Sequence, residues 1–240
     1  MRDPGRDALF SWAIALVLVV GFVHINVTLP AIGHVGSALV AVLFLYGPMG
    51  IAKVRHEDLD DYGFHAHPVA RGLAFAGGAI GIIFPIFCVG YFAFYETACG
   101  SHLLAHLVPR GMCSHYAGLH GVHAPTLSLG FAKWCAVQLL VVALPEELFV
   151  RGCLLRLLEQ KFPPKRRILG GGVGLALVIS AAMFALIHLP KDGDPRALAT
   201  FFPGLLFGWM RSATGSILGS TITHGASNIL IRLLDLSVLR

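Results

Sequence analysis

Charged residues are scarce in this sequence: Lys, Arg, Asp and Glu make up 13% of the 240 residues, whereas hydrophobic residues make up 56%. A soluble domain of this length needs many more polar side chains to cover its surface, so the scarcity excludes a soluble enzyme, a DNA-binding module and a disordered linker. The five cysteines are too few for a disulfide scaffold. A mean hydropathy of +0.74 instead predicts that most residues meet lipid.

Long apolar stretches are present, and seven of them are close to the roughly 20 residues needed to cross a bilayer. They are Leu9–Leu29, Ala31–Ala52, Gly72–Tyr95, Leu127–Leu158, Ile168–Leu189, Ala197–Met210 and Ser216–Leu236. The fourth is long and the sixth is short, which allows six to eight spans. The sequence therefore predicts an all-α, polytopic membrane helix bundle with about seven transmembrane helices.

The polar connections between these stretches predict the orientation of the chain. Residues 53–71 and 159–167 carry clusters of Lys and Arg, which favour the cytoplasmic side. With seven spans, the N-terminus is then cytoplasmic too. The net charge of +5 follows from these loops, where basic residues meet anionic lipid headgroups, and does not imply nucleic acid. Cys99 and Cys113 share the predicted outer loop; they can form a disulfide if that side is oxidising, or remain two free thiols.

Three ionisable residues lie within six positions of the fourth stretch: Glu146, Glu147 and Arg151. Each costs roughly 2.5–3.5 kcal/mol at bilayer depth, so their presence needs a reason. Glu147 and Arg151 are four apart and can neutralise each other on one helix face. Glu146, about 100° around the helix, is then free to face a cavity. Pro145 cannot donate a backbone hydrogen bond, so it predicts a helix kink and a backbone carbonyl that is free to bind water. Alternatively, Pro145 begins an interfacial helix whose first turn carries both carboxylates.

Polar residues also stand in two later stretches. His188 lies near the end of the fifth, and His224 and Asn228, at i, i+4 spacing, point from one face of the last. At a rise of about 1.5 Å per residue, all of them lie within a turn or two of the depth of Glu146. Four polar groups from three helices can therefore meet at one site. Each histidine taken alone is equally well explained as a hydrogen-bonding partner between helices.

Taken together, these motifs resemble a family of intramembrane proteases, CPBP, also called ABI. It is named for CAAX-prenyl endopeptidases and bacteriocin-processing or immunity proteins. The motifs are Glu146-Glu147-x-x-x-Arg151, Phe184-x-x-x-His188 and His224-x-x-x-Asn228, in the family's order. The segment 202–209 also looks like the family's small-residue segment, and its glycines predict close helix contact.

The apolar stretches predict a single transmembrane domain over residues 1–240, with N-terminal helices in 1–95 and an outer loop in 96–127. The resemblance, which runs from Glu146 to Asn228, implies a catalytic core in 128–236. It further implies an intramembrane endopeptidase that hydrolyses a peptide bond in a membrane-associated protein or peptide, as in the maturation of a C-terminal tail or a leader. The implied partners are that substrate and the bilayer, and the implied location is a bacterial inner membrane.

Roles for the residues follow from the same resemblance. Glu146 with His188 would hold and deprotonate a water, and His224 and Asn228 would donate hydrogen bonds to the oxyanion. Glu147 and Arg151 would support them. The cofactor stays open: zinc could be held by Glu146, His188 and His224 in a metalloprotease scheme, but the amide of Asn228 is an unusual zinc ligand, which favours a metal-free glutamate mechanism.

Two other classes of function are compatible with the sequence. The first is a non-catalytic membrane scaffold or bacteriocin-immunity protein of the same fold, in which the polar residues only hold helices together. The second is a small transporter or haem-binding bundle that uses the intramembrane Glu and His for protons or iron. A transporter predicts repeat symmetry, which the sequence does not display.

Overall fold

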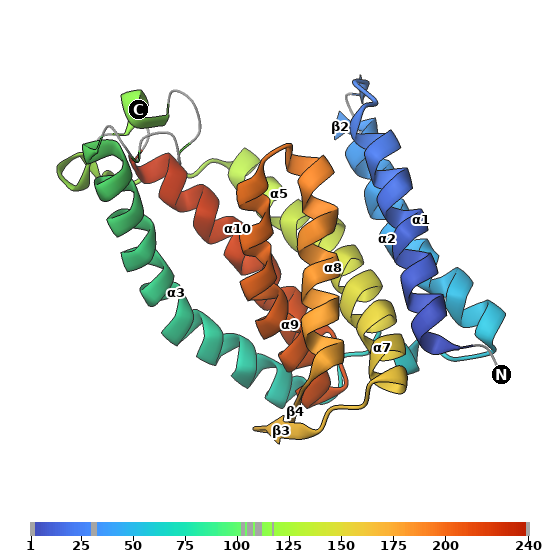
Figure 1. Ribbon diagram of the computed structural model, residues 1–240. Coiled ribbons are helices and arrows are strands. Elements are labelled where there is room, and N and C mark those ends of the chain that lie inside the picture. Colours follow the sequence, from blue (N-terminus) through green and yellow to red (C-terminus); the bar gives the residue numbers. More distant parts are fainter. Residues whose placement is uncertain are drawn as a thin grey trace.

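The computed structural model describes residues 3–29, 33–101, 104, 108, 112–116 and 118–238, and it is built almost entirely from helices (Figure 1). The two small sheets within the described residues are two-stranded hairpins that connect helices. The all-α class predicted from the sequence is thus confirmed.

The N-terminal helices α1 (Pro4–Val23) and α2 (Val35–Arg55) lie side by side at one edge of the molecule (Figure 1). Asp3 caps α1, because its side chain accepts hydrogen bonds from the N–H groups of Gly5 and Arg6. Strands β1 (Thr28–Leu29) and β2 (Gly33–His34) pair between the two helices.

At the opposite edge stands α3 (Val69–Gly100), which follows the short η1 (Asp60–Tyr62). Its two ends approach α10: Gly72 packs against Gly219 at one end, and Tyr91 donates a hydrogen bond to Asp235, 2.7 Å away, towards the other. The short helices α4 (Met112–His115) and η3 (Leu119–Gly121) follow in the loop after α3.

One continuous helical segment runs through the middle of the bundle. Its parts are α5 (Leu129–Val137), the π-helical η4 (Gln138–Ala143), α6 (Leu144–Glu147), the π-helical η5 (Leu148–Leu155) and α7 (Arg156–Lys161). Pro145 lies well inside this segment, between the two π-helical parts. The alternative that Pro145 begins an interfacial helix is therefore wrong, because about four helical turns precede it and Glu146 and Glu147 are buried.

The C-terminal part begins with a hairpin of β3 (Arg166–Ile168) and β4 (Gly171–Val173) and continues with α8 (Leu175–Asp192), the 3₁₀ segment η6 (Pro195–Thr200), α9 (Phe201–Thr214) and α10 (Leu218–Val238). The fifth apolar stretch was expected to span from Ile168, but the glycines of 170–174 form the hairpin and its exit instead. The close contacts expected at the glycines of segment 202–209 are found: a Cβ on Gly208 would lie 2.5 Å from Leu177, and one on Gly204 would lie 3.3 Å from Ala181.

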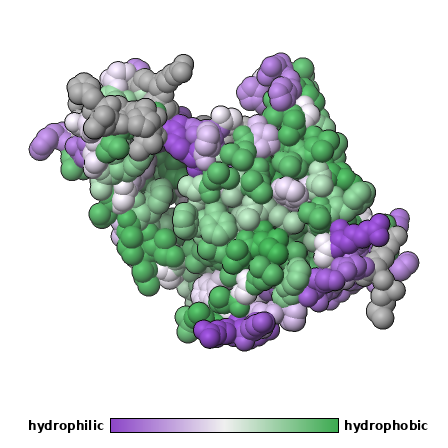
Figure 2. Space-filling view, viewed as in Figure 1, coloured by the Kyte–Doolittle hydropathy of each residue, from purple (hydrophilic) through white to green (hydrophobic). Residues whose placement is uncertain are grey.

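Three of the described helices, α1, α2 and α3, are long and apolar enough to cross a membrane, and α8 is a shorter apolar helix. Figure 2 shows hydrophobic side chains over the middle of the molecule and hydrophilic ones towards its two ends. These features are those of an integral membrane protein. The expected number of about seven spans is not confirmed.

One end of the bundle is held by ion pairs, which we call the ion-pair clasp: Asp3, Asp7, Arg55, Glu57, Tyr62, Arg156 and Lys161. At its centre, Glu57 accepts hydrogen bonds from Arg156 at 2.6 Å and from Tyr62 at 2.8 Å. Burial opposes ionisation of Glu57, but these hydrogen bonds and the two arginines outweigh it and hold the pKa of Glu57 below its ordinary value.

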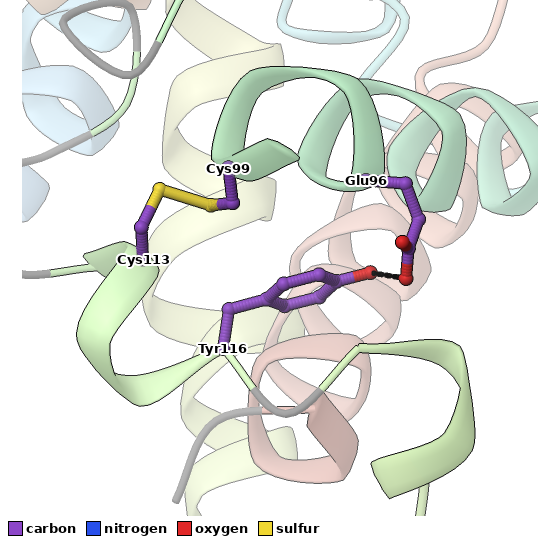
Figure 3. Close-up of a disulfide and its surroundings, with 4 residues drawn as sticks. All are labelled: Glu96, Cys99, Cys113 and Tyr116. Carbon is purple, nitrogen blue, oxygen red and sulfur yellow. Dashed lines mark hydrogen bonds between the residues drawn. A yellow bond between two sulfur atoms is a disulfide. The ribbon is translucent and has the colours of Figure 1, made fainter. Parts of the chain in front are cut away.

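The other end of the bundle is held covalently. Cys99 at the end of α3 forms a disulfide with Cys113 on α4, as Figure 3 shows, so the pairing that the sequence left open is formed. Beside it, Glu96 accepts hydrogen bonds from the hydroxyl of Tyr116 at 2.9 Å and from the N–H of Leu119 at 2.7 Å. Burial and this hydrogen bond raise the pKa of Tyr116 to about 12.

Candidate active site

Glu146, His188 and His224 come from three helices, α6, α8 and α10, and converge in the bundle. The Nε2 atoms of His188 and His224 lie 3.8 and 3.7 Å from Oε2 of Glu146. All three residues are buried, with exposed fractions of 8% or less. The sequence placed them at similar depth, and the structure brings them together.

The second ring nitrogen of each histidine faces an acceptor. Nδ1 of His188 lies 2.8 Å from the carbonyl oxygen of Phe184, and Nδ1 of His224 lies 3.0 Å from Oε1 of Glu147. Since a carbonyl and a carboxylate can only accept, Nδ1 carries the hydrogen in both rings. In neutral imidazoles, the Nε2 atoms that face Glu146 are therefore acceptors.

Glu147 and Arg151 form the expected ion pair on one face of the central helix. Nη1 of Arg151 lies 2.9 Å from Oε1 of Glu147, and both side chains are fully buried. Arg151 also donates to the carbonyl oxygen of Gly204, 3.4 Å away on α9. Because Oε1 of Glu147 also faces Nδ1 of His224, the ion pair positions that imidazole, a contact the sequence did not predict.

Two aromatic rings enclose the charged groups. The guanidinium of Arg151 lies 4.0 Å from the ring centroid of Phe184 and 5.3 Å from that of Phe207. Phe184 also meets His188 edge to face at 4.5 Å, and Phe207 stacks on His224 at 5.1 Å. These contacts stabilise a buried cation and restrict both imidazole rings.

A cavity of about 450 Å³ opens beside Glu146 and both histidines. Its other walls come from the ends of α1 and α2, from η4 and from α9 and α10, and most of them are apolar. Asn228 also lines it, but the amide of Asn228 donates a hydrogen bond to Oε1 of Gln138, 3.1 Å away on η4. All four expected catalytic residues therefore border one cavity.

Gln138 is the residue of the site that sequence reasoning missed. The available signal was an amide in an otherwise apolar stretch, eight residues before Glu146 and so about two helical turns away. Its partner Asn228 is distant in the sequence, and nothing in the spacing indicated their contact.

The expected zinc ligands, if the protein binds zinc, are Glu146, His188 and His224. Their types suit zinc, and histidines that ligate zinc commonly donate Nδ1–H to a carbonyl or a carboxylate, as these do. Within the described part of the chain, however, no three His, Cys, Asp or Glu side chains are placed so that they could hold a metal ion. The arrangement as it stands does not fit a metal site.

Comparison with protein families gives a match over part of the chain. Residues 128–230 match the family described as Type II CAAX prenyl endopeptidase Rce1-like. The match contains Gln138 and the four expected catalytic residues, but not the cavity-lining residues of α1 and α2. No curated protein and no solved structure gives a significant match to the chain.

Proposed function

We propose that this chain, whose residues 128–230 match the Rce1-like protease family, is an intramembrane endopeptidase whose general base is Glu146. One observation carries the proposal: a buried carboxylate and two imidazoles, all within the residues that match a protease family, converge on one cavity. A purely structural role for the polar residues does not explain why they border a cavity that is open enough for a peptide segment.

The first step is the activation of water. A water molecule in the cavity can contact the carboxylate of Glu146 and donate its other hydrogen to Nε2 of His188, which is an acceptor in the neutral ring. Glu146 takes one proton as the water oxygen attacks the scissile carbonyl carbon. The same carboxyl group then gives that proton to the leaving amine.

The second requirement is a donor for the oxyanion. The amide of Asn228 has two N–H groups, and Gln138 accepts from one of them, which orients the other. We assign the oxyanion contact to this amide and to Nε2 of His224. Because Nδ1 of His224 already donates to Glu147, Nε2 can donate only when the ring is protonated, so the contribution of His224 requires the imidazolium.

For the topology we propose that the central segment 129–161, α8, α9 and α10 cross the membrane together with α1, α2 and α3. The Cys99–Cys113 disulfide and the basic β3–β4 hairpin lie at opposite ends of the bundle (Figure 1). A disulfide favours the oxidising side and basic loops favour the cytoplasm, so both support a cytoplasmic N-terminus. The membrane that we propose is a bacterial inner membrane.

The proposed substrate is a membrane-associated protein or peptide that is shortened at a C-terminal tail or a leader. The cavity supports a substrate of this kind because most of its lining is apolar, from Val23 on α1 to Ile231 on α10. An extended apolar segment can be bound there with its backbone near Glu146.

The test replaces Glu146 with Gln, which is nearly isosteric but cannot accept the proton. Cells expressing the wild type and E146Q are compared by mass spectrometry of the terminal peptides of their membrane proteins. We expect cleaved termini that depend on the wild-type protein and fall by about 10²-fold or more in E146Q at equal abundance. The matched control E96Q changes the carboxylate beside the disulfide and should process normally. Unchanged processing in E146Q would sink the proposal.

Chelation tests whether a metal takes part. Since the described side chains do not form a metal site, we expect the purified protein to keep its activity after treatment with a strong chelator, with less than one equivalent of zinc found by elemental analysis. Loss of activity that returns only when zinc is added would instead assign Glu146, His188 and His224 as ligands.

A further inference from the structure

The β3–β4 hairpin carries a feature that the protease reaction does not use. It projects from one end of the bundle beneath α3 and α9 (Figure 1). Ile168 pairs with Gly171, so Leu169 and Gly170 form the two-residue turn at its tip. Both turn residues have positive φ, 49° for Leu169 and 86° for Gly170, as in a type I′ turn.

Leu169 is the wrong residue for such a turn in water. The first position of a type I′ turn favours Asn, Asp or Gly, because a branched side chain at positive φ is strained. In addition, 73% of Leu169 and 57% of the neighbouring Ile168 are exposed. An exposed apolar side chain therefore stands at a position where it is also strained, and its exposure is explained if the tip is not surrounded by water.

The backbone at the tip is satisfied by protein groups. The carbonyl oxygen of Ile168 accepts from the indole of Trp209 at 2.8 Å, that of Leu169 from Arg71 at 2.9 Å, and that of Gly170 from Arg167 at 3.2 Å. Exposed turn carbonyls are ordinarily hydrogen-bonded to water, and at the hydrocarbon boundary each one left unpaired is costly. A tip immersed in lipid requires that its carbonyl groups accept hydrogen bonds from the protein, and three consecutive carbonyls of this tip do so.

Basic side chains surround the apolar tip. Lys165, Arg166 and Arg167 are exposed on the hairpin, and Arg71 lies beside it on α3. The lower edge of Figure 2, where Figure 1 places the hairpin, shows strongly hydrophilic side chains next to hydrophobic ones. An apolar tip surrounded by basic side chains complements a membrane surface, in which anionic phosphate groups lie above acyl chains.

We propose that the β3–β4 hairpin is a binding site for anionic phospholipids, in which Ile168 and Leu169 enter the acyl region and Arg166 and Arg167 bind the headgroup phosphates. The site is firmly joined to the bundle. Besides the bond from Trp209, the N–H of Gly172 donates to Ser212 on α9 at 3.0 Å. Because α9 also carries Phe207 of the cavity wall, bound lipid stabilises the wall of the site as well as the hairpin.

The first experiment measures lipid binding to the purified full-length chain in neutral detergent by native mass spectrometry and by thermal unfolding. We expect phosphatidylglycerol to bind and raise Tm, whereas phosphatidylcholine and inorganic phosphate do not. Replacing Arg166 and Arg167 with Gln should weaken phosphatidylglycerol binding by about fivefold for each arginine. The matched control replaces Lys133 and Arg232, which are exposed on α5 and α10, with Gln and should leave binding unchanged.

The second experiment locates the tip. Leu169→Trp is placed in phosphatidylglycerol nanodiscs, and its added fluorescence is compared with that of the wild type. Brominated acyl chains should quench the added signal, and aqueous iodide should not. Quenching by iodide alone, equal binding of inorganic phosphate, or an equal loss of binding in the Lys133 and Arg232 control would each overturn the lipid site.

Discussion

Two groups of arginines and glutamates hold helices together in this molecule, and they differ chiefly in their exposure to solvent. In the ion-pair clasp, the side chains of Arg55, Glu57 and Arg156 retain 13–18% of their exposure. In the site, Glu147 and Arg151 retain none. The clasp joins several partners at the end of the bundle, whereas the site depends on a single carboxylate oxygen that faces both a guanidinium and an imidazole.

The same residue types perform different tasks at different depths of the bundle. Near solvent, a lost ion pair can be replaced by water, so each pair contributes little. In the buried site, nothing replaces the missing partner, and the remaining charge is left in a low-dielectric environment. The buried pair therefore adds little net stability of its own, but breaking it is costly, and it fixes the orientation of His224.

Arg151→Met should produce the largest effect, because it leaves Glu147 buried without its counter-ion. We expect the free energy of unfolding to fall by about 3–5 kcal/mol, with a matching loss of abundance. The matched variant Arg156→Met changes the same residue type in the clasp on the same helical segment, and should cost about 1 kcal/mol. Unfolding in detergent measures both, and equal losses would contradict the difference between the two regions.

Replacing both members of the buried pair separates stability from activity. Glu147→Met combined with Arg151→Met removes both charges, so most of the stability lost in Arg151→Met should return. Activity should not return, because Nδ1 of His224 has lost the carboxylate that positions it. Abundance and processing are measured together; recovery of processing would show that Glu147 does not position His224.

The clasp should give a smaller effect that depends on pH. Because the pKa of Glu57 is lowered in the folded protein, its contribution is present above its ordinary value of 4.5 and is lost as the pH falls through the lowered pKa. From about pH 6 to about pH 3, the Tm of the wild type should therefore fall more steeply than that of Glu57→Gln, in which this contribution is absent throughout. If the Tm of the wild type and that of Glu57→Gln fell in parallel, Glu57 would not be the source of this pH dependence.

The smallest effect is expected at the rim of the clasp, where Lys161 pairs with Asp3 at 2.6 Å and both side chains are nearly half exposed. Lys161→Gln should change the free energy of unfolding by at most about 0.5 kcal/mol, and salt should abolish the difference. Thermal unfolding at low and high ionic strength tests this, and a loss as large as that of Arg156→Met would show that the rim is not weaker than the centre.

Regular helix geometry accounts for what the sequence could predict. The i, i+4 spacing of Glu147 and Arg151 predicted their ion pair, and the rise per residue predicted that Glu146 and the two histidines would meet. Contacts that depend on the relative rotation of separate helices could not be predicted from the spacing of residues within one helix. The Glu147 contact to His224 and the Gln138 contact to Asn228 are of that kind.

Departures from regular helix geometry account for the features that the sequence did not predict. The hairpin at 166–173 replaces the first part of an expected apolar span, because its glycines and the turn at Leu169 permit a conformation that hydropathy does not register. The π-helical parts on either side of α6 were not predicted either, since backbone hydrogen bonding to the fifth residue leaves no clear mark on the sequence. The roles of the site residues remain a proposal that the E146Q experiment tests.

The π-helical parts also indicate where the central segment can change in length. A one-residue deletion within Gln138–Ala143 would replace hydrogen bonds to the fifth residue by ordinary α-helical ones, so the helix on either side would keep its orientation. The same deletion in the α-helical α5, α6 or α7 would turn all that follows by about 100° relative to all that precedes it. Homologues that retain this site are therefore expected to place one-residue gaps in the π-helical parts or in the loop between α3 and α5, and not in α6.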